Sequence, residues 1–233
     1  MSMVISATSE KGGSGKSTLV TNMAAYWANK GESVVVLDLD PQASSKTWGR
    51  LREEAGDGLE TITVLGLEEL ERSGADRSDL DVGSIVERAR ARWDRVLLDV
   101  PGADNRLQRG ALLACDVALM PIKASGFDAL AAPNTFAVLE ALGKARSQSA
   151  QPVRAMMVFN FARPRSVAVR ETARVYKQDM PGIEVLSVRL HHREDFADAA
   201  LVGMGVVEYD PGSKAAVEVR HLAREIDDAY AQE

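Results

Sequence analysis

An eight-residue run near the start of the chain has the residue types of a phosphate-binding loop. It reads Lys-Gly-Gly-Ser-Gly-Lys-Ser-Thr over residues 11–18, between a short apolar run and a helical pattern, which is the context such a loop requires. Backbone N–H groups of the turn and the positive end of the helix dipole would face the phosphates, Lys16 would reach the outer ones, and the Ser17 hydroxyl would bind Mg²⁺. We therefore expect a nucleoside triphosphate site formed by Gly12, Gly13, Ser14, Gly15, Lys16, Ser17 and Thr18.

The loop departs from the common spacing G-x-x-x-x-G-K-[ST] at one position. That pattern needs glycine at position 10, where this chain has Glu10, and Lys11 stands at the front of the loop instead. The pattern K-G-G-x-G-K-[ST] resembles the deviant Walker A motif of the ParA/MinD family of ATPases. The resemblance implies that ATP is the nucleotide and that two subunits sandwich two nucleotides, with Lys11 of one subunit at the phosphates of the other. Lys11 and Lys16 are therefore candidate catalytic residues.

Two acidic residues lie at the end of the next predicted strand. Asp38 and Asp40 follow the β-branched run of residues 33–37, at the carboxyl end where α/β proteins bind ligands. Helix capping or turn formation is the alternative role for such residues. The tripeptide Asp40-Pro41-Gln42 also resembles the second motif of the ParA/MinD family. That resemblance implies that Asp40 orients or activates the attacking water and that Asp38 is a supporting carboxylate near the lysines.

A third carboxylate, Asp99, follows the apolar run of residues 96–98. A carboxylate at the end of a strand can hold a magnesium-bound water, which is the Walker B arrangement. Alone this signal is weak, since many parallel strands end in this way, but its place after the first two motifs and before Pro101-Gly102 strengthens it. Ser17, Asp40 and Asp99 are the predicted Mg²⁺ ligands.

Two later segments are candidate contacts for the base of the nucleotide. Asn160 ends a predicted strand, and an asparagine opposite the phosphate loop can read the adenine edge, a role that the family resemblance supports; a turn residue bonded to nearby backbone is the alternative. The run from Gly205 to Pro211 resembles the late loop of the family, which closes over the base. The resemblance therefore adds Asp210 and Pro211.

Strand and helix patterns alternate along the chain. We expect strands at 3–7, 33–39, 61–65, 95–98, 116–122, 154–159 and 183–190, and helices at 17–29, 43–54, 85–93, 127–146, 166–178, 195–201 and 213–229. This order predicts an α/β fold with a mostly parallel P-loop NTPase sheet covered by helices on both faces. The length of 233 residues and the lack of linkers or repeats predict a single domain over residues 1–233.

Basic residues are concentrated in one segment of an otherwise acidic chain. The formal charge is −6, yet residues 152–193 hold eight basic and three acidic residues. Arg170, Arg174 and Lys177 fall on one face of a predicted helix, at a spacing that can contact successive phosphates without reading bases. A solvated helix face is the alternative. ParA-like proteins bind DNA non-specifically through this half, so the resemblance favours a DNA face and adds Arg193 and Lys214.

Other sequence features narrow the class of protein. There is no signal-peptide pattern and no run of about 18 apolar residues, so we expect a cytoplasmic protein. The single cysteine, Cys115, lies in an apolar stretch where we expect it to be buried, and one cysteine is too few for an iron–sulfur cluster.

The resemblance predicts an Mg²⁺-dependent ATPase that is stimulated by DNA and a partner. It would form an ATP-dependent homodimer, bind nonspecific DNA on the nucleoid and, with a ParB-like or other cargo adaptor, segregate or position a plasmid, a chromosome origin or a large protein complex. A MinD-like membrane cycle is one alternative, but it needs a basic amphipathic C-terminal helix, whereas residues 213–233 are acidic overall. A P-loop metabolic ligase of the same fold is the other alternative.

Overall fold

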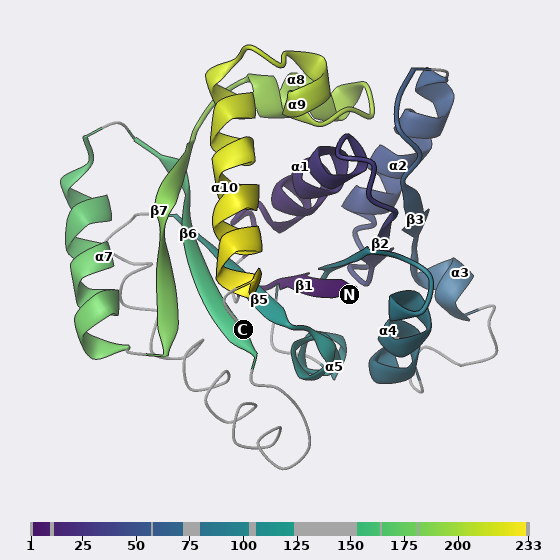
Figure 1. The fold of residues 1–233 in the computed structure, drawn as a ribbon, viewed down its shortest axis with the longest axis horizontal. Coiled ribbons are helices and arrows are strands. Elements are labelled where there is room, and N and C mark those ends of the chain that lie inside the picture. The colour runs from purple at the N-terminus through teal and green to yellow at the C-terminus, as the bar shows by residue number, and fades with distance from the viewer. Residues whose placement is uncertain are drawn as a thin grey trace.

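A seven-stranded sheet forms the centre of the molecule (Figure 1). The computed structural model describes residues 2–9, 12–56, 58–71, 80–102, 106–123, 153–163, 165–180 and 182–231. The strand order is β3-β2-β4-β1-β5-β6-β7, and every neighbouring pair is parallel, which confirms the predicted fold class. The strands are β1 (Met3–Ala7), β2 (Val34–Asp38), β3 (Thr63–Leu65), β4 (Arg95–Asp99), β5 (Val117–Lys123), β6 (Arg154–Ala162) and β7 (Ile183–His191).

Helices connect these strands and cover the sheet. They are α1 (Lys16–Ala28), α2 (Ser44–Ala55), α3 (Leu67–Glu71), α4 (Val82–Arg90), α5 (Arg106–Ala114), α7 (Val167–Asp179), α8 (Asp195–Leu201), α9 (Val206–Tyr209) and α10 (Lys214–Ala231). Of these, α3, α5 and α9 were not predicted. The helix predicted at 127–146 lies outside the described residues.

Both faces of the sheet are covered by helices and buried. Successive residues of each strand point to opposite sides, so each strand contributes to both faces. In β1, Met3 and Ile5 pack in the cluster that includes α1 and α10, whereas Val4 packs in the cluster that includes α4 and α5. A third cluster joins α7 to β6 and to the start of β7. Cys115 is fully buried, as predicted.

The carboxyl ends of the parallel strands meet along one edge of the sheet. Ala7, the last residue of β1, lies opposite Asp99 of β4, and Asp38 of β2 lies opposite the same aspartate. On the other side of β1, Lys123 of β5 lies opposite Asn160 of β6. The loop after β1 is therefore flanked by carboxylates on one side and by basic and amide groups on the other. Among the described residues no helix is long and apolar enough to cross a membrane.

Candidate functional site

The glycine-rich loop connects β1 to α1 with its backbone in the left-handed region at two positions. Gly13 has φ 70° and Gly15, which caps α1, has φ 92°. No side chain caps α1, and its first turn holds no acidic residue. The first N–H groups of this 13-residue helix are therefore left for an anion, and the helix dipole favours one there. The part of the predicted loop from Gly12 to Thr18 is described, and Lys11 is not.

Asn160 holds the loop from the side. Its amide nitrogen donates to the Ser14 carbonyl at 2.8 Å, and its amide oxygen accepts the Phe161 N–H at 2.9 Å. A Cβ atom at Gly15 would lie 2.1 Å from the same amide nitrogen, so only glycine leaves room for this contact. Asn160 is 5% exposed. The residue predicted to read adenine thus contacts the loop and its own neighbour in this structure, and its contact with a base stays a prediction.

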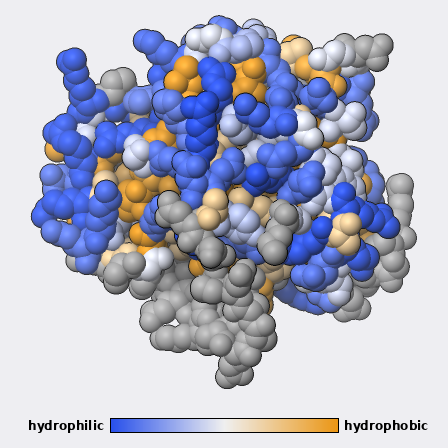
Figure 2. All heavy atoms as spheres, in the orientation of Figure 1, coloured by the Kyte–Doolittle hydropathy of each residue, from blue (hydrophilic) through white to orange (hydrophobic). Residues whose placement is uncertain are grey.

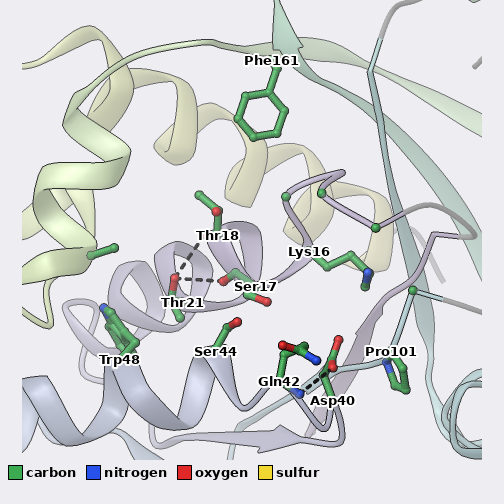
Figure 3. Close-up of a pocket in the computed structure, with 15 residues that line it drawn as sticks. Lys16, Ser17, Thr18, Thr21, Asp40, Gln42, Ser44, Trp48, Pro101 and Phe161 are labelled. Carbon is green, nitrogen blue, oxygen red and sulfur yellow. Dashed lines mark hydrogen bonds between the residues drawn. The ribbon is translucent and has the colours of Figure 1, made fainter.

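A cavity of about 650 Å³ opens above the loop. Figure 3 shows Lys16, Asp40 and Pro101 on one side of it and Trp48 on the other, with the ring of Phe161 extending toward it from the end of β6. The volume is within the usual range for small-molecule sites. The lining residues are Gly12, Gly13, Gly15, Lys16, Ser17, Thr18, Thr21, Asp40, Gln42, Ser44, Trp48, Pro101, Gly102, Phe161 and Ala200.

Asp99 is buried at the end of β4, next to the loop. Its Oδ2 accepts the Ser45 hydroxyl at 2.7 Å, and its Oδ1 is buried with no hydrogen-bond partner among the described residues. Burial raises the pKa of Asp99, while the hydroxyl groups of Ser45 and Ser17 and the ammonium group of Lys16 oppose that rise. A buried carboxylate oxygen without a donor is a group that a cation or its bound water would satisfy.

The oxygen groups at this edge fit the predicted Mg²⁺ ion. Ser17 and Asp40 line the cavity, and Asp99 is buried beside the lining residues Lys16 and Ser17. In the part of the chain that the structure describes, no three His, Cys, Asp or Glu side chains form a metal-binding cluster of their own. Mg²⁺ usually binds through one or two carboxylates together with phosphate oxygens and water.

Asp38 and Asp40 have different surroundings. Asp38 is 1% exposed, and its two oxygens accept the N–H groups of Asp40 at 3.1 Å and of Lys46, in the first turn of α2, at 2.8 Å. It therefore caps α2 and the turn before it, and it contacts backbone rather than a lysine ammonium group. Burial, and then the charge of Asp99, raises the pKa of Asp38 to about 6. Asp40 is partly exposed, accepts the Gln42 N–H at 2.9 Å and faces the cavity (Figure 3).

The other predicted residues lie away from the cavity lining. Asp210 and Pro211 are exposed in the turn between α9 and α10, where Asp210 accepts the Gly212 N–H at 3.0 Å. Arg193 is partly buried and pairs with Glu218 of α10 at 2.5 Å. The side chains of Arg170, Arg174, Lys177 and Lys214 are exposed.

Several lining residues carried no signal in the sequence. Trp48 of α2 is 4% exposed and donates its indole N–H to the Met204 carbonyl at 3.1 Å, which fixes the ring at the cavity wall. Phe161, at the end of β6, has φ 52°, a left-handed conformation that is uncommon for a bulky residue. Position alone would have pointed to Phe161, because it directly follows Asn160.

Comparison with known proteins identifies the family. The CobQ/CobB/MinD/ParA nucleotide binding domain matches residues 5–206. The maintenance of carboxysome distribution protein A of Halothiobacillus neapolitanus is 25% identical over 93% of this chain and 92% of its own length. The chromosome-partitioning ATPase Soj of Thermus thermophilus is 26% identical over 95% of this chain and 94% of its own length.

Solved structures show the same fold. The septum site-determining protein MinD of Pyrococcus horikoshii, complexed with Mg-ADP, superposes with a TM-score of 0.71 at 22% identity and covers 99% of this chain and 98% of its own. The family match spans most of the chain, including the loop and both strands that carry the carboxylates. The chain therefore belongs to the CobQ/CobB/MinD/ParA nucleotide-binding domain family, whose MinD and ParA members are ATPases.

Proposed function

We propose that this protein is a ParA-type positioning ATPase. It binds Mg²⁺ and ATP, dimerises when ATP is bound, and then binds the DNA of the nucleoid without sequence specificity. The observation that carries the proposal is the cavity that brings together Lys16, the uncapped start of α1 and Asp40. These groups supply a cation, free N–H donors and a carboxylate around one space, which are the parts that phosphoryl transfer to water requires.

The residues of the candidate site have distinct roles in the proposed reaction. The N–H groups of the loop and Lys16 bind and orient the phosphates, and Asp40 positions the attacking water and accepts its proton. Ser17, Asp40 and Asp99 would hold Mg²⁺, which supplies charge neutralisation at the phosphate oxygens. Lys11 lies outside the described residues. Its predicted contact with the phosphates of a second subunit remains part of the proposal.

The exposed face of α7 is the proposed DNA surface. Arg170, Arg174 and Lys177 are all exposed on this helix, and Arg174 pairs only with Glu171 among the described residues, at 3.1 Å on the same helix. In Figure 2 the side of the molecule that carries α7 is covered mainly by hydrophilic residues. Lys214 is a further exposed candidate, whereas Arg193 is less available because Glu218 holds its guanidinium group.

The contacts of α10 argue against the alternative of a membrane cycle. Seven of its apolar residues are buried in the cluster that also holds α1, and Val217 is an exposed exception at 39%: Ala215, Ala216, Val219, Leu222, Ala223, Ile226 and Ala229. An amphipathic helix that binds a membrane needs a free apolar face. The buried apolar face of α10 is therefore already used inside the fold.

One assay tests the chemistry. Asp40→Ala should lower ATP turnover by about 10²- to 10⁴-fold, the usual loss when a general base is removed, while ATP binding persists. Turnover is measured by phosphate release and the ATP-bound dimer by light scattering, and the variant should accumulate that dimer. Normal hydrolysis by Asp40→Ala would remove Asp40 from its role, and failure of the wild-type chain to bind ATP would refute the proposal.

A second assay tests the DNA surface. The double change Arg170→Glu with Arg174→Glu should weaken ATP-dependent retention on DNA and flatten its dependence on salt. Arg88 and Arg92 provide a matched control, because they are exposed and four residues apart, with Arg88 in another helix, α4, and Arg92 just past its end. Equal loss with Arg88→Glu and Arg92→Glu would show that total charge matters rather than the face of α7.

A further inference from the structure

Lys123 occupies a position beside the phosphate loop that no motif marks. It is the last residue of β5, the strand next to β1, and lies opposite Asn160. Since Asn160 itself bonds the loop at Ser14, the end of β5 comes to the flank of the loop that faces away from Asp38 and Asp99.

The ammonium group of Lys123 reaches two residues of the cavity wall. It lies 4.8 Å from the centre of the Phe161 ring and 3.8 Å from the place that a Cβ atom on Gly13 would take. Gly13 and Phe161 both line the cavity. Lys123 is not itself a lining residue, but its side chain is exposed, and its flexible stem can bring the ammonium group past the ring.

Lys123 also differs from a lysine of α2 that has a structural role. Lys46 of α2 is neutralised by Glu69 at 2.8 Å and donates to the Val64 carbonyl at 3.0 Å. Lys123 has no carboxylate within salt-bridge distance among the described residues, and its contact there is with the ring of Phe161. An exposed cation–π contact is weak compared with a charge-assisted hydrogen bond to a phosphate.

We propose that Lys123 is a nucleotide-binding residue whose ammonium group binds a phosphate oxygen of the nucleotide, as a second cation of the site after Lys16. The inference rests on the proposed function, because it requires that a nucleotide polyphosphate occupies this cavity. Lys16 approaches the phosphates from within the loop and Lys123 from its β5 flank. Phe161 keeps the ammonium group at the rim until the phosphate arrives.

Nucleotide affinity separates this role from a structural one. Displacement of a fluorescent ADP analogue by ATP, ADP and adenosine is measured for the wild-type chain, Lys123→Gln and Lys123→Arg. We expect Lys123→Gln to weaken ATP and ADP about tenfold, as for the loss of one charge-assisted hydrogen bond, and to leave adenosine unchanged because it has no phosphate. Lys123→Arg keeps the charge and should recover most of the affinity.

Two further variants decide between a direct contact and an effect through Phe161. In a Phe161→Leu background, Lys123→Gln should still weaken ATP about tenfold if the lysine contacts the phosphate; no additional loss would show that it acts only on the ring, and would overturn the proposal. Lys30→Gln is the matched control, since Lys30 is also exposed and lies 5.8 Å from a ring centre, that of Tyr26, at the other end of α1. Its ATP affinity should stay at the wild-type value.

The outcomes also distinguish this inference from the function on which it rests. If the wild-type chain binds ATP and Lys123→Gln binds it equally well, only the role of Lys123 is refuted. Equal weakening of ATP and adenosine would likewise refute a phosphate contact. If the wild-type chain does not bind ATP, the proposed function fails, and the inference fails with it.

Discussion

Buried charges are treated differently in two regions of the molecule. Beside the cavity, Asp38 and Asp99 are almost fully buried, burial raises both pKa values, and one oxygen of Asp99 lacks a partner among the described residues. Where α2 meets α9, Arg52 and Glu208 are also buried, with 5% and 6% of their side chains exposed, but they form two hydrogen bonds of 2.7 and 2.8 Å. The Arg52 guanidinium group donates to two backbone carbonyls as well.

The difference shows which charges serve the fold and which are kept for a ligand. Arg52 and Glu208 neutralise each other, so a buried pair joins two helices without an uncompensated charge. The aspartates accept hydrogen bonds from backbone and hydroxyl donors and pair with no arginine among the described residues, and the Lys16 ammonium group only partly offsets the burial of Asp99. A raised carboxyl pKa is typical of functional sites. The following predictions test that contrast, from the largest effect on stability to the smallest.

Removal of Arg52 should be the most damaging of these changes. Arg52→Ala leaves Glu208 buried without a counter-charge, which costs about 3–5 kcal/mol in the free energy of unfolding. Urea unfolding measures the loss. Arg50→Ala is the control on the same helix, because Arg50 pairs with Glu54 at 2.8 Å with 63% and 57% of the side chains exposed, and it should cost less than about 1 kcal/mol. Equal losses in the two variants would contradict a special role for the buried pair.

The stability of the protein should carry a pH-dependent contribution from Asp38. Its pKa is about 6 in the folded chain against a usual 3.8, so between these values the folded state holds a proton that the unfolded state has released. The contribution is therefore present below pH 3.8 and is lost as the pH rises through 6, by an amount on the order of 3 kcal/mol.

The Asp38→Asn variant isolates this contribution. Asparagine cannot ionise, so the difference in unfolding free energy between wild type and variant should shift in favour of the variant across that pH range, whatever its value at low pH. Carboxylates that do not interact with Asp38 act equally in the two chains and cancel in the difference, whereas the charges of Asp99 and Asp40, which act on Asp38, belong to the measured contribution. A difference that stays constant with pH would mean that Asp38 titrates normally.

The same chemical change should have opposite effects in the two regions. Glu208→Gln removes the counter-charge of Arg52 and should destabilise the fold by about 2 kcal/mol. Asp99→Asn removes a buried charge that no arginine balances and should raise stability by about 1 kcal/mol while lowering ATP turnover, as expected where a site trades stability for function. Urea unfolding and phosphate release are measured on both variants. Destabilisation of similar size in both would erase the contrast.

Local patterns predicted most of the sheet, and one helix was missed for a clear reason. The bounds of β1 match the prediction, because a buried parallel strand is a continuous apolar run between polar turns. Helix α5 was missed because its apolar residues continue into β5, and the sequence from Ala111 to Met120 shows a single polar break. That break, Asp116, accepts the Val4 N–H at 2.8 Å and pairs with Arg90, and both partners are far away in sequence.

The site could be predicted only where it is contiguous in sequence. The loop and Asp40 belong to short motifs, so their residue types and spacing indicated a shared chemistry before the fold was known. Trp48 and Phe161 reach the cavity through tertiary packing, as Lys123 reaches the Phe161 ring, and no local pattern records which loops meet. Asp38 is a case in which the alternative interpretation fits better. Helix capping was the alternative role for this residue, and it describes the contacts that the two carboxylate oxygens make.

Exposed charges form a third class, and Arg174 gives the smallest predicted effect on the fold. Its guanidinium group lies 3.1 Å from Glu171, with 62% and 59% of the side chains exposed, so Arg174→Gln should change the free energy of unfolding by less than about 0.5 kcal/mol. If α7 contacts DNA, the same change should lower the slope of log affinity against log salt by about one, because one fewer counterion is released.

Arg50→Gln is the matched change away from α7, and it should be equally silent in urea and also silent in the DNA assay. A loss of DNA affinity in both variants would mean that overall charge, rather than the α7 face, governs binding. A loss of stability above about 1 kcal/mol for Arg174→Gln would place Arg174 with Arg52, as a charge that the fold needs and that is therefore not free for a partner.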